Sequence, residues 1–103
     1  AMGAALFGEA VSARQAEQWG LIWRVVPDEA LADTLAEVTA TLAAGPTRAY
    51  GATKAALHAS SGHTLAEQFD LECRLQRELG YTDDYLEGMQ AFAQKRTPAF
   101  KGR

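Results

Sequence analysis

Two histidines, His58 and His63, lie on either side of the turn sequence Ser60-Ser61-Gly62. Imidazole is the commonest metal ligand among side chains, so two of them beside one turn suggest a metal site. A zinc site needs three or four ligands at suitable spacing, and no third ligand accompanies this pair. We therefore expect capping or surface roles for both histidines, and no metal-binding residues.

Asp83 and Asp84 are adjacent carboxylates, the residue type that general acid–base catalysis uses. Neighbouring residues at the start of a helix point in different directions, and the helix dipole favours acidic residues there. Capping of a helix explains both residues without catalysis. We expect no catalytic role for this pair.

Phe92 and Lys95 combine an aromatic face with an ammonium group at a spacing of three residues. In a helix this spacing places both side chains on one face. An aromatic ring there suits a purine base, and a lysine suits a phosphate. The pattern alone favours a simpler interpretation, in which Phe92 is a core aromatic and Lys95 is a solvated cation at the negative end of the helix dipole.

The composition is that of an ordinary globular domain. The 103 residues are 48% hydrophobic and 22% charged, with a formal net charge of −3 and a pI near 5.3. This charge provides no field that would attract nucleic acid or an anionic membrane surface, and no run is apolar enough to span a bilayer. The only cysteine, Cys73, excludes an intramolecular disulfide and a cysteine-based zinc site. A cytoplasmic location is the expectation.

The first quarter of the chain shows a short helix between two less regular stretches. Residues 1–8 are apolar and helix-compatible without the usual polar lead-in, so we expect that the sequence begins inside an element of a longer protein. Ser12 is a candidate N-cap for a helix over 13–19, which Gly20 would end. The β-branched run 21–26 predicts a short strand or extended segment.

The rest of the sequence predicts helices. Leu31, Leu35, Val38 and Leu42 form one apolar stripe at helical period, and Gly45-Pro46 would end that helix. Further helices are expected over 47–59, over 64–79 with a capping box at Thr64 and Glu67, and from Thr82 to about residues 95–96. The expected fold class is all-α with one short extended segment near the N-terminus.

The last third carries the most specific pattern. Residues 82–100 fit T-x-D-x-x-E-G-x-x-A-F-x-x-K-R-x-P-x-F, which resembles the C-terminal signature of the enoyl-CoA hydratase/isomerase (crotonase) superfamily. Residues 6–13 are similar to its L-x-G-x-x-[IVL]-[ST]-A segment, and residues 16–22 to its A-x-x-x-G-L-[VI] segment. The wording of residues 19–26 is most similar to the bacterial isomerases of phenylacetate degradation.

The resemblance implies a division of labour within a larger ClpP-like fold. A spiral β core upstream binds the acyl-CoA thioester, polarises its carbonyl with two backbone amides and supplies the acidic catalytic groups. The resemblance makes residues 1–26 the tail of that spiral domain and residues 27–103 the C-terminal helical oligomerisation region of a trimer or hexamer. The spiral core is then absent from this chain, which would hold no catalytic residue and would be inactive alone.

The resemblance also implies a role for Phe92 and Lys95. They match positions where family members pack an aromatic ring on adenine and direct a lysine at the nucleotide phosphates. The ligand would be the coenzyme A part of the acyl-CoA substrate, and no separate cofactor is expected.

Two alternatives remain open. The first is a free-standing helical oligomerisation module without enzymatic activity. The second is a small helical protein that binds CoA or an acyl carrier, although few basic residues cluster near Phe92 and Lys95 to hold phosphates. For a fragment, the apolar face that docks on the spiral core would be exposed, and we expect it to include some of Leu6, Phe7, Leu21, Ile22 and Trp23 and to promote non-native self-association.

Overall fold

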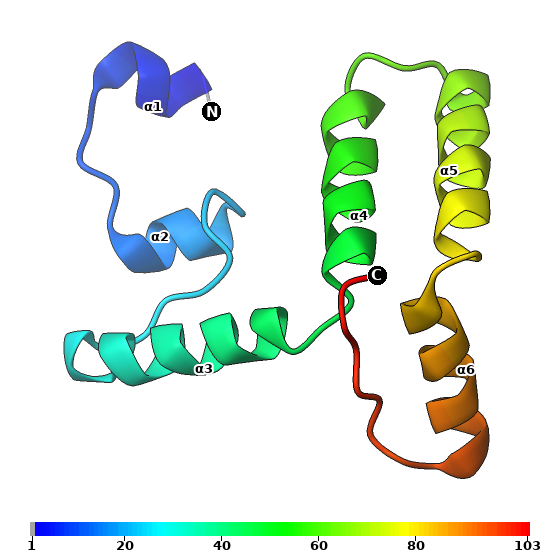
Figure 1. The fold of residues 1–103 in the computed structure, drawn as a ribbon. Coiled ribbons are helices and arrows are strands. Elements are labelled where there is room, and N and C mark those ends of the chain that lie inside the picture. The colour runs from blue at the N-terminus through cyan, green and yellow to red at the C-terminus, as the bar shows by residue number, and fades with distance from the viewer. Residues whose placement is uncertain (1) are drawn as a thin grey trace. The chain divides into compact units, whose positions relative to one another are not determined.

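A computed structural model describes residues 2–103 (Figure 1), which form helices joined by loops, with no strand among them. The predicted all-α class is therefore confirmed for this part of the chain. The residues divide into two compact units, Ala1–Ala36 and Glu37–Arg103. The assignment of residues 1–26 to a spiral domain and of 27–103 to an oligomerisation domain stays a prediction.

The first unit contains short helices. These are α1 (Met2–Phe7), α2 (Ala13–Gln18), a 3₁₀ turn (Asp28–Ala30) and the beginning of α3 (Leu31–Ala43). A helix of six residues is too short to be stable by itself, so these elements depend on their caps and on neighbouring chain.

Helix α2 begins and ends where the sequence predicts. The Ser12 side chain accepts a hydrogen bond from the Gln15 N–H at 3.2 Å, as an N-cap does. Gly20 has φ 72°, the left-handed conformation that glycine adopts without a steric cost. The helix ends at Gln18 rather than at Trp19, within the usual uncertainty of helix ends.

Residues 21–26 are irregular, with bends at 21–23, and form no strand. The Leu21 N–H donates to the Ala16 carbonyl at 2.9 Å, and the Val25 N–H donates to the Glu17 carboxylate at 2.8 Å. These bonds run to α2 instead of to a neighbouring strand. The predicted strand is absent, and the segment instead folds back on the preceding helix.

Helix α3 confirms the predicted apolar stripe as a helix but not as a buried face. In this stripe Leu31, Leu35 and Leu42 are each more than half exposed, and the fourth member, Val38, is partly buried. An exposed stripe of leucines is apolar surface that another molecule or chain segment can cover.

Helices α4 (Thr47–Ser60) and α5 (Leu65–Leu79) form an antiparallel pair in the second unit (Figure 1). Their partly buried residues recur every three or four positions, which identifies the side of each helix that meets the other. Small side chains on α4 allow close approach to the larger ones on α5. These residues are Ala52, Ala56 and Ala59 on α4, and Leu71, Leu75 and Leu79 on α5.

The capping box predicted at the start of α5 is confirmed. The Glu67 N–H donates to the Thr64 hydroxyl at 3.4 Å, and the Thr64 N–H donates to the Glu67 carboxylate at 2.8 Å. The hydrogen bonds from the backbone and side chain of Thr64 lower the pKa of Glu67 below its ordinary value. This box fixes the direction in which the chain enters α5.

Much of the apolar surface is open to solvent. Leu6, Phe7, Leu21, Ile22 and Trp23 are all exposed, as predicted for a face that docks elsewhere. Within residues 2–103, no helix has the length and apolar character needed to cross a membrane.

Candidate functional site

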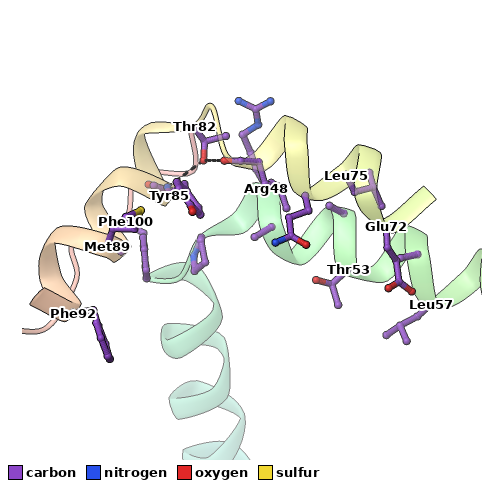
Figure 2. Close-up of a pocket in the computed structure, with 18 of the residues that line it drawn as sticks. Arg48, Thr53, Leu57, Glu72, Leu75, Thr82, Tyr85, Met89, Phe92 and Phe100 are labelled. Carbon is purple, nitrogen blue, oxygen red and sulfur yellow. Dashed lines mark hydrogen bonds between the residues drawn. The ribbon is translucent and has the colours of Figure 1, made fainter. Parts of the chain in front are cut away.

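An apolar groove of about 780 Å³ lies between α4, α5 and α6 (Asp83–Gln94) in the second unit (Figure 2). This volume is within the range of small-molecule sites. Carbon-rich side chains form its walls, with Ala49 and Leu57 from α4, Leu75 and Leu79 from α5, and Tyr85, Met89 and Phe92 from α6.

Polar groups at the α4–α5 side of the groove hold the two helices together. The Gln68 side-chain amide donates to the Ala56 carbonyl at 3.2 Å and to the Glu72 carboxylate at 2.8 Å. One amide therefore links α5 to the backbone of α4. These hydrogen bonds of Gln68 position the groove walls that α4 and α5 form, and they provide no nucleophile or acid–base pair.

Thr82 fixes the start of α6 and is almost fully buried. Its hydroxyl accepts from the Tyr85 N–H at 3.2 Å and donates to the Leu79 carbonyl at 2.6 Å (Figure 2). The predicted N-cap is confirmed. Because the hydroxyl also donates to the end of α5, it sets the angle at which α6 leaves α5 and thus the position of the third groove wall.

The Asp84 side chain forms hydrogen bonds that the sequence did not predict. Its carboxylate is buried and accepts the Lys101 N–H at 2.7 Å and the Gly102 N–H at 2.8 Å, while its own N–H donates to the Arg103 carbonyl at 3.0 Å. The expectation that capping explains both aspartates is therefore wrong for Asp84. Asp83 is an exposed residue of the first turn.

Glu87 makes a second tie to the end of the chain. Its carboxylate accepts hydrogen bonds from both terminal nitrogens of Arg96, at 2.6 and 2.9 Å, and from the Ala99 N–H at 2.7 Å. The hydrogen bonds from Arg96 and then from Ala99 lower the pKa of Glu87 to about 2, and the same pairing raises the pKa of Arg96. A bidentate guanidinium–carboxylate pair adds directional specificity to this turn.

Phe92 is one of the residues that line the groove (Figure 2), and the residue is 88% exposed. The interpretation as a core aromatic therefore does not hold for the described residues. Lys95 lies just beyond α6 in the left-handed conformation, with φ 54° and ψ 39°. Because Lys95 is outside the helix, the shared-face argument from helical spacing does not apply to it.

The whole chain, residues 1–103, matches the profile of the family described as Enoyl-CoA hydratase/isomerase. The chain belongs to this family. Its matched region is all-helical wherever the structure describes it, as expected for the C-terminal helical region of the crotonase fold.

Two curated relatives in the enoyl-CoA hydratase/isomerase family are each 48% identical to all 103 residues. They are 1,2-epoxyphenylacetyl-CoA isomerase of Escherichia coli K12 and a probable enoyl-CoA hydratase of Rhodobacter capsulatus, of which the chain covers 39% and 40%. The crystal structure of a putative enoyl-CoA hydratase/isomerase from Mycobacterium abscessus matches with a TM-score of 0.91 at 31% identity, over 98% of this chain and 39% of that one. The chain thus spans about two-fifths of the length of these relatives.

The enoyl-CoA hydratase/isomerase signature has a physical explanation in this structure. Three of its residues, Asp84, Glu87 and Arg96, hold the end of the chain in place through their carboxylates and guanidinium, and Thr82 caps α6. Ala91, also in the signature, is buried, with 1% of its surface exposed. The side chains of Phe92 and Lys95 are exposed and form no hydrogen bond or ion pair with the residues that the structure describes.

The two histidines take the surface roles expected of them. His63 Nδ1 lies 3.1 Å from the Gln68 side-chain oxygen, and the His58 backbone carbonyl accepts from the Ser61 hydroxyl at 3.5 Å. In the part of the chain that the structure describes, no cluster of three or more histidine, cysteine or acidic side chains could hold a metal ion.

Proposed function

We propose that this chain forms part of an enoyl-CoA hydratase/isomerase that acts on an acyl-CoA thioester. In that enzyme it packs subunits in a trimer or hexamer and forms one wall of the CoA site, while the catalytic groups lie elsewhere. The family membership supports the acyl-CoA class. The relative that isomerises 1,2-epoxyphenylacetyl-CoA, at 48% identity, supports a place in phenylacetate degradation.

The observation that carries the CoA role is the contrast within the signature. Asp84, Glu87 and Arg96 each have partners within the chain, whereas the side chains of Phe92 and Lys95 are exposed and have no polar partner among residues 2–103. An exposed aromatic ring loses water-exposed apolar area when it stacks on a purine. An ammonium group close by in the chain suits the phosphates of the same nucleotide.

The backbone of Lys95 adds support. A left-handed conformation costs an L-residue with a Cβ roughly 1–2 kcal/mol, and glycine or asparagine would adopt it more easily. A lysine at such a position is therefore unfavourable for the fold alone. A favourable contact between its ammonium group and an anion would offset this cost.

A chimera tests the proposal. The matched region of the Escherichia coli isomerase is replaced by this chain, and turnover of 1,2-epoxyphenylacetyl-CoA is measured. We expect an active chimera in which Phe92→Ala and Lys95→Ala each raise KM roughly tenfold with little change in kcat, since they remove about 1.4 kcal/mol of uniform substrate binding.

Matched controls separate CoA contact from folding. Leu86→Ala removes another exposed apolar side chain of α6, and Lys54→Ala removes another exposed lysine. Both are expected to leave KM unchanged. An inactive chimera would contradict the assigned function of the region, and equal effects of the test and control substitutions would contradict the CoA assignment of Phe92 and Lys95.

The leucines of α3 favour a packing role as well. Leu31, Leu35 and Leu42 are 57%, 62% and 51% exposed along one stripe. This surface also suits the alternative of an oligomerisation module without enzymatic activity. Two measurements together distinguish the enzyme part from the free-standing module. If the chain is only an oligomerisation module, light scattering of the chain alone should show self-association that Leu35→Glu abolishes. The same alternative predicts that catalysis by the chimera does not depend on Phe92.

A further inference from the structure

The last residues of the chain connect two walls of the groove. Residues 96–103, which we call the C-terminal strap, turn back after α6 and run along it toward the beginning of α4 (Figure 1). Helix α4 packs directly against α5. Helix α6 follows α5 through a short turn, and the strap is its second connection to the pair.

The side of the strap that faces α6 is held by main-chain hydrogen bonds. The N–H groups of Ala99, Lys101 and Gly102 donate to two carboxylates of α6, at 2.7, 2.7 and 2.8 Å. Those carboxylates belong to Asp84 and Glu87, which are three residues apart and therefore on one side of the helix. Because charged acceptors strengthen such bonds, the strap is fixed in register along α6.

The strap also contacts the groove and α4. Phe100 is half-buried, lines the groove, and lies close to Gly88, where an added Cβ would be 3.7 Å from its ring. Gly102 has φ 72° and approaches Thr47, the first residue of α4, so closely that any Cβ on it would collide with the Thr47 hydroxyl. The strap thus has α6 on one side and the start of α4 on the other.

From these contacts we propose that the C-terminal strap ties α6 to the beginning of α4 and thereby sets the width of the groove. Asp84 is the positioning residue of this tie, since its carboxylate accepts two of the three strap amides. Released from Asp84, the strap no longer limits how far α6 swings from α4 on its turn at Thr82. The proposal rests on these contacts and does not depend on what the groove binds.

The test measures the separation of α4 and α6 in the 103-residue chain. Spin labels are attached through ketone-bearing amino acids at the exposed positions 54 and 90, with Cys73→Ser in every variant. Pulsed electron paramagnetic resonance then gives the distribution of distances between the two labels. We expect Asp84→Asn to broaden that distribution and to speed amide exchange at residues 101 and 102 at least tenfold. Asp70→Asn, the same change at an exposed residue of α5, is expected to match the parent. Asp83 does not serve as this control, because its carboxylate pairs with Arg103 of the strap at 3.5 Å.

A crosslink provides a rescue that a general loss of stability would not show. A Cβ built on Gly102 lies 3.9 Å from the Thr47 Cβ, a separation that a disulfide bridges. Thr47→Cys with Gly102→Cys, oxidised in the Asp84→Asn protein, is expected to restore the narrow distribution, whereas the same double variant kept reduced is not. The reduced form carries the same strain at Gly102, where φ is 72°. If the oxidised crosslink does not narrow the distance distribution, the proposal is overturned.

A second variant covers the case in which Asp84→Asn loses its helices, as judged by circular dichroism. Lys101→Pro removes one N–H donor from the strap and leaves α6 unchanged. It is expected to broaden the same distribution while helical content is retained. If Lys101→Pro and Asp84→Asn both give the same distance distribution as the control Asp70→Asn, the strap does not set the width of the groove.

Discussion

The α4–α5 pair and the region formed by α6 and the strap are held together in different ways. In the pair, partly buried alanines such as Ala52 and Ala56 face leucines such as Leu75, so the contact is mostly apolar, with one directional bond from the Gln68 amide to the Ala56 carbonyl. In the other region, carboxylates of α6 accept specific main-chain amides and a guanidinium. The first depends on volume and the second on the position of single oxygen atoms.

This difference explains where the sequence is most recognisable. Apolar packing tolerates many side chains of similar volume, so α4 and α5 show only a helical period. Carboxylates that meet fixed amides do not tolerate such exchange, because one methylene more or less moves the acceptor. The family signature at residues 82–100 therefore includes specific bonding groups, at Thr82, Asp84, Glu87 and Arg96, in addition to small and aromatic residues.

The largest effect is expected where the α6 region is most tightly packed. Ala91 is 1% exposed, and its carbonyl accepts the Arg96 N–H at 3.0 Å where the chain leaves α6. Ala91→Leu should lower the free energy of unfolding by about 1–3 kcal/mol through overpacking. Ala93→Leu makes the same change at an exposed position and should have little effect. Urea unfolding followed by circular dichroism compares them, and equal effects would contradict the prediction.

The hydrogen bonds that the Glu87 carboxylate accepts from Arg96 and Ala99 should be lost in acid. The pKa of Glu87 in the folded protein is about 2, below the ordinary value of 4.5, so its contribution is complete above pH 4.5 and is lost as the pH falls from there toward 2. The amide resonance of Ala99 should follow this transition, because its N–H donates to the carboxylate. Glu87→Gln should remove the transition at Ala99, and an unchanged transition in that variant would assign it to another group.

The α4–α5 pair offers a smaller change that leaves the strap alone. Thr64→Ala removes the N-cap of α5 and should lower the free energy of unfolding by about 1 kcal/mol. Amide exchange should quicken in the first turn of α5 and stay unchanged at Lys101. Thr53→Ala, within α4, is the control and should not destabilise. Faster exchange at Lys101 in Thr64→Ala would show that the two regions are not held independently.

The smallest change is expected to be stabilising. Lys95→Gly relieves the left-handed strain and should raise the free energy of unfolding by a few tenths to about 1 kcal/mol. The same substitution one residue earlier, Gln94→Gly, falls inside α6 and should lower it by up to about 1 kcal/mol. Thermal unfolding distinguishes the signs, and a destabilising Lys95→Gly would show that the lysine side chain contributes to the fold.

Local signals were sufficient to predict most of the helices. Ser12, Thr64 and Thr82 each cap the helix expected of them, because a cap and its partner are only two or three residues apart. The apolar period of α3 likewise reports a helix, but it cannot report what covers the leucines.

The polar ties were not predictable in the same way. The Asp84 carboxylate meets amides that are 17 and 18 residues later in the chain, and Glu87 meets Arg96 nine residues on. These contacts exist only after the strap has turned back, and Lys95 provides the turn from a conformation that its residue type does not favour. A family pattern marked these positions as special without indicating why.

An oxygen that accepts a main-chain N–H is indifferent to the side chain on that residue. The strap positions 99 and 101 are recognised in this way by Glu87 and Asp84. The side chains at these two positions can thus vary between related proteins, or be replaced by reporter groups, without loss of these hydrogen bonds. Proline alone is barred from both positions, because it has no N–H to donate.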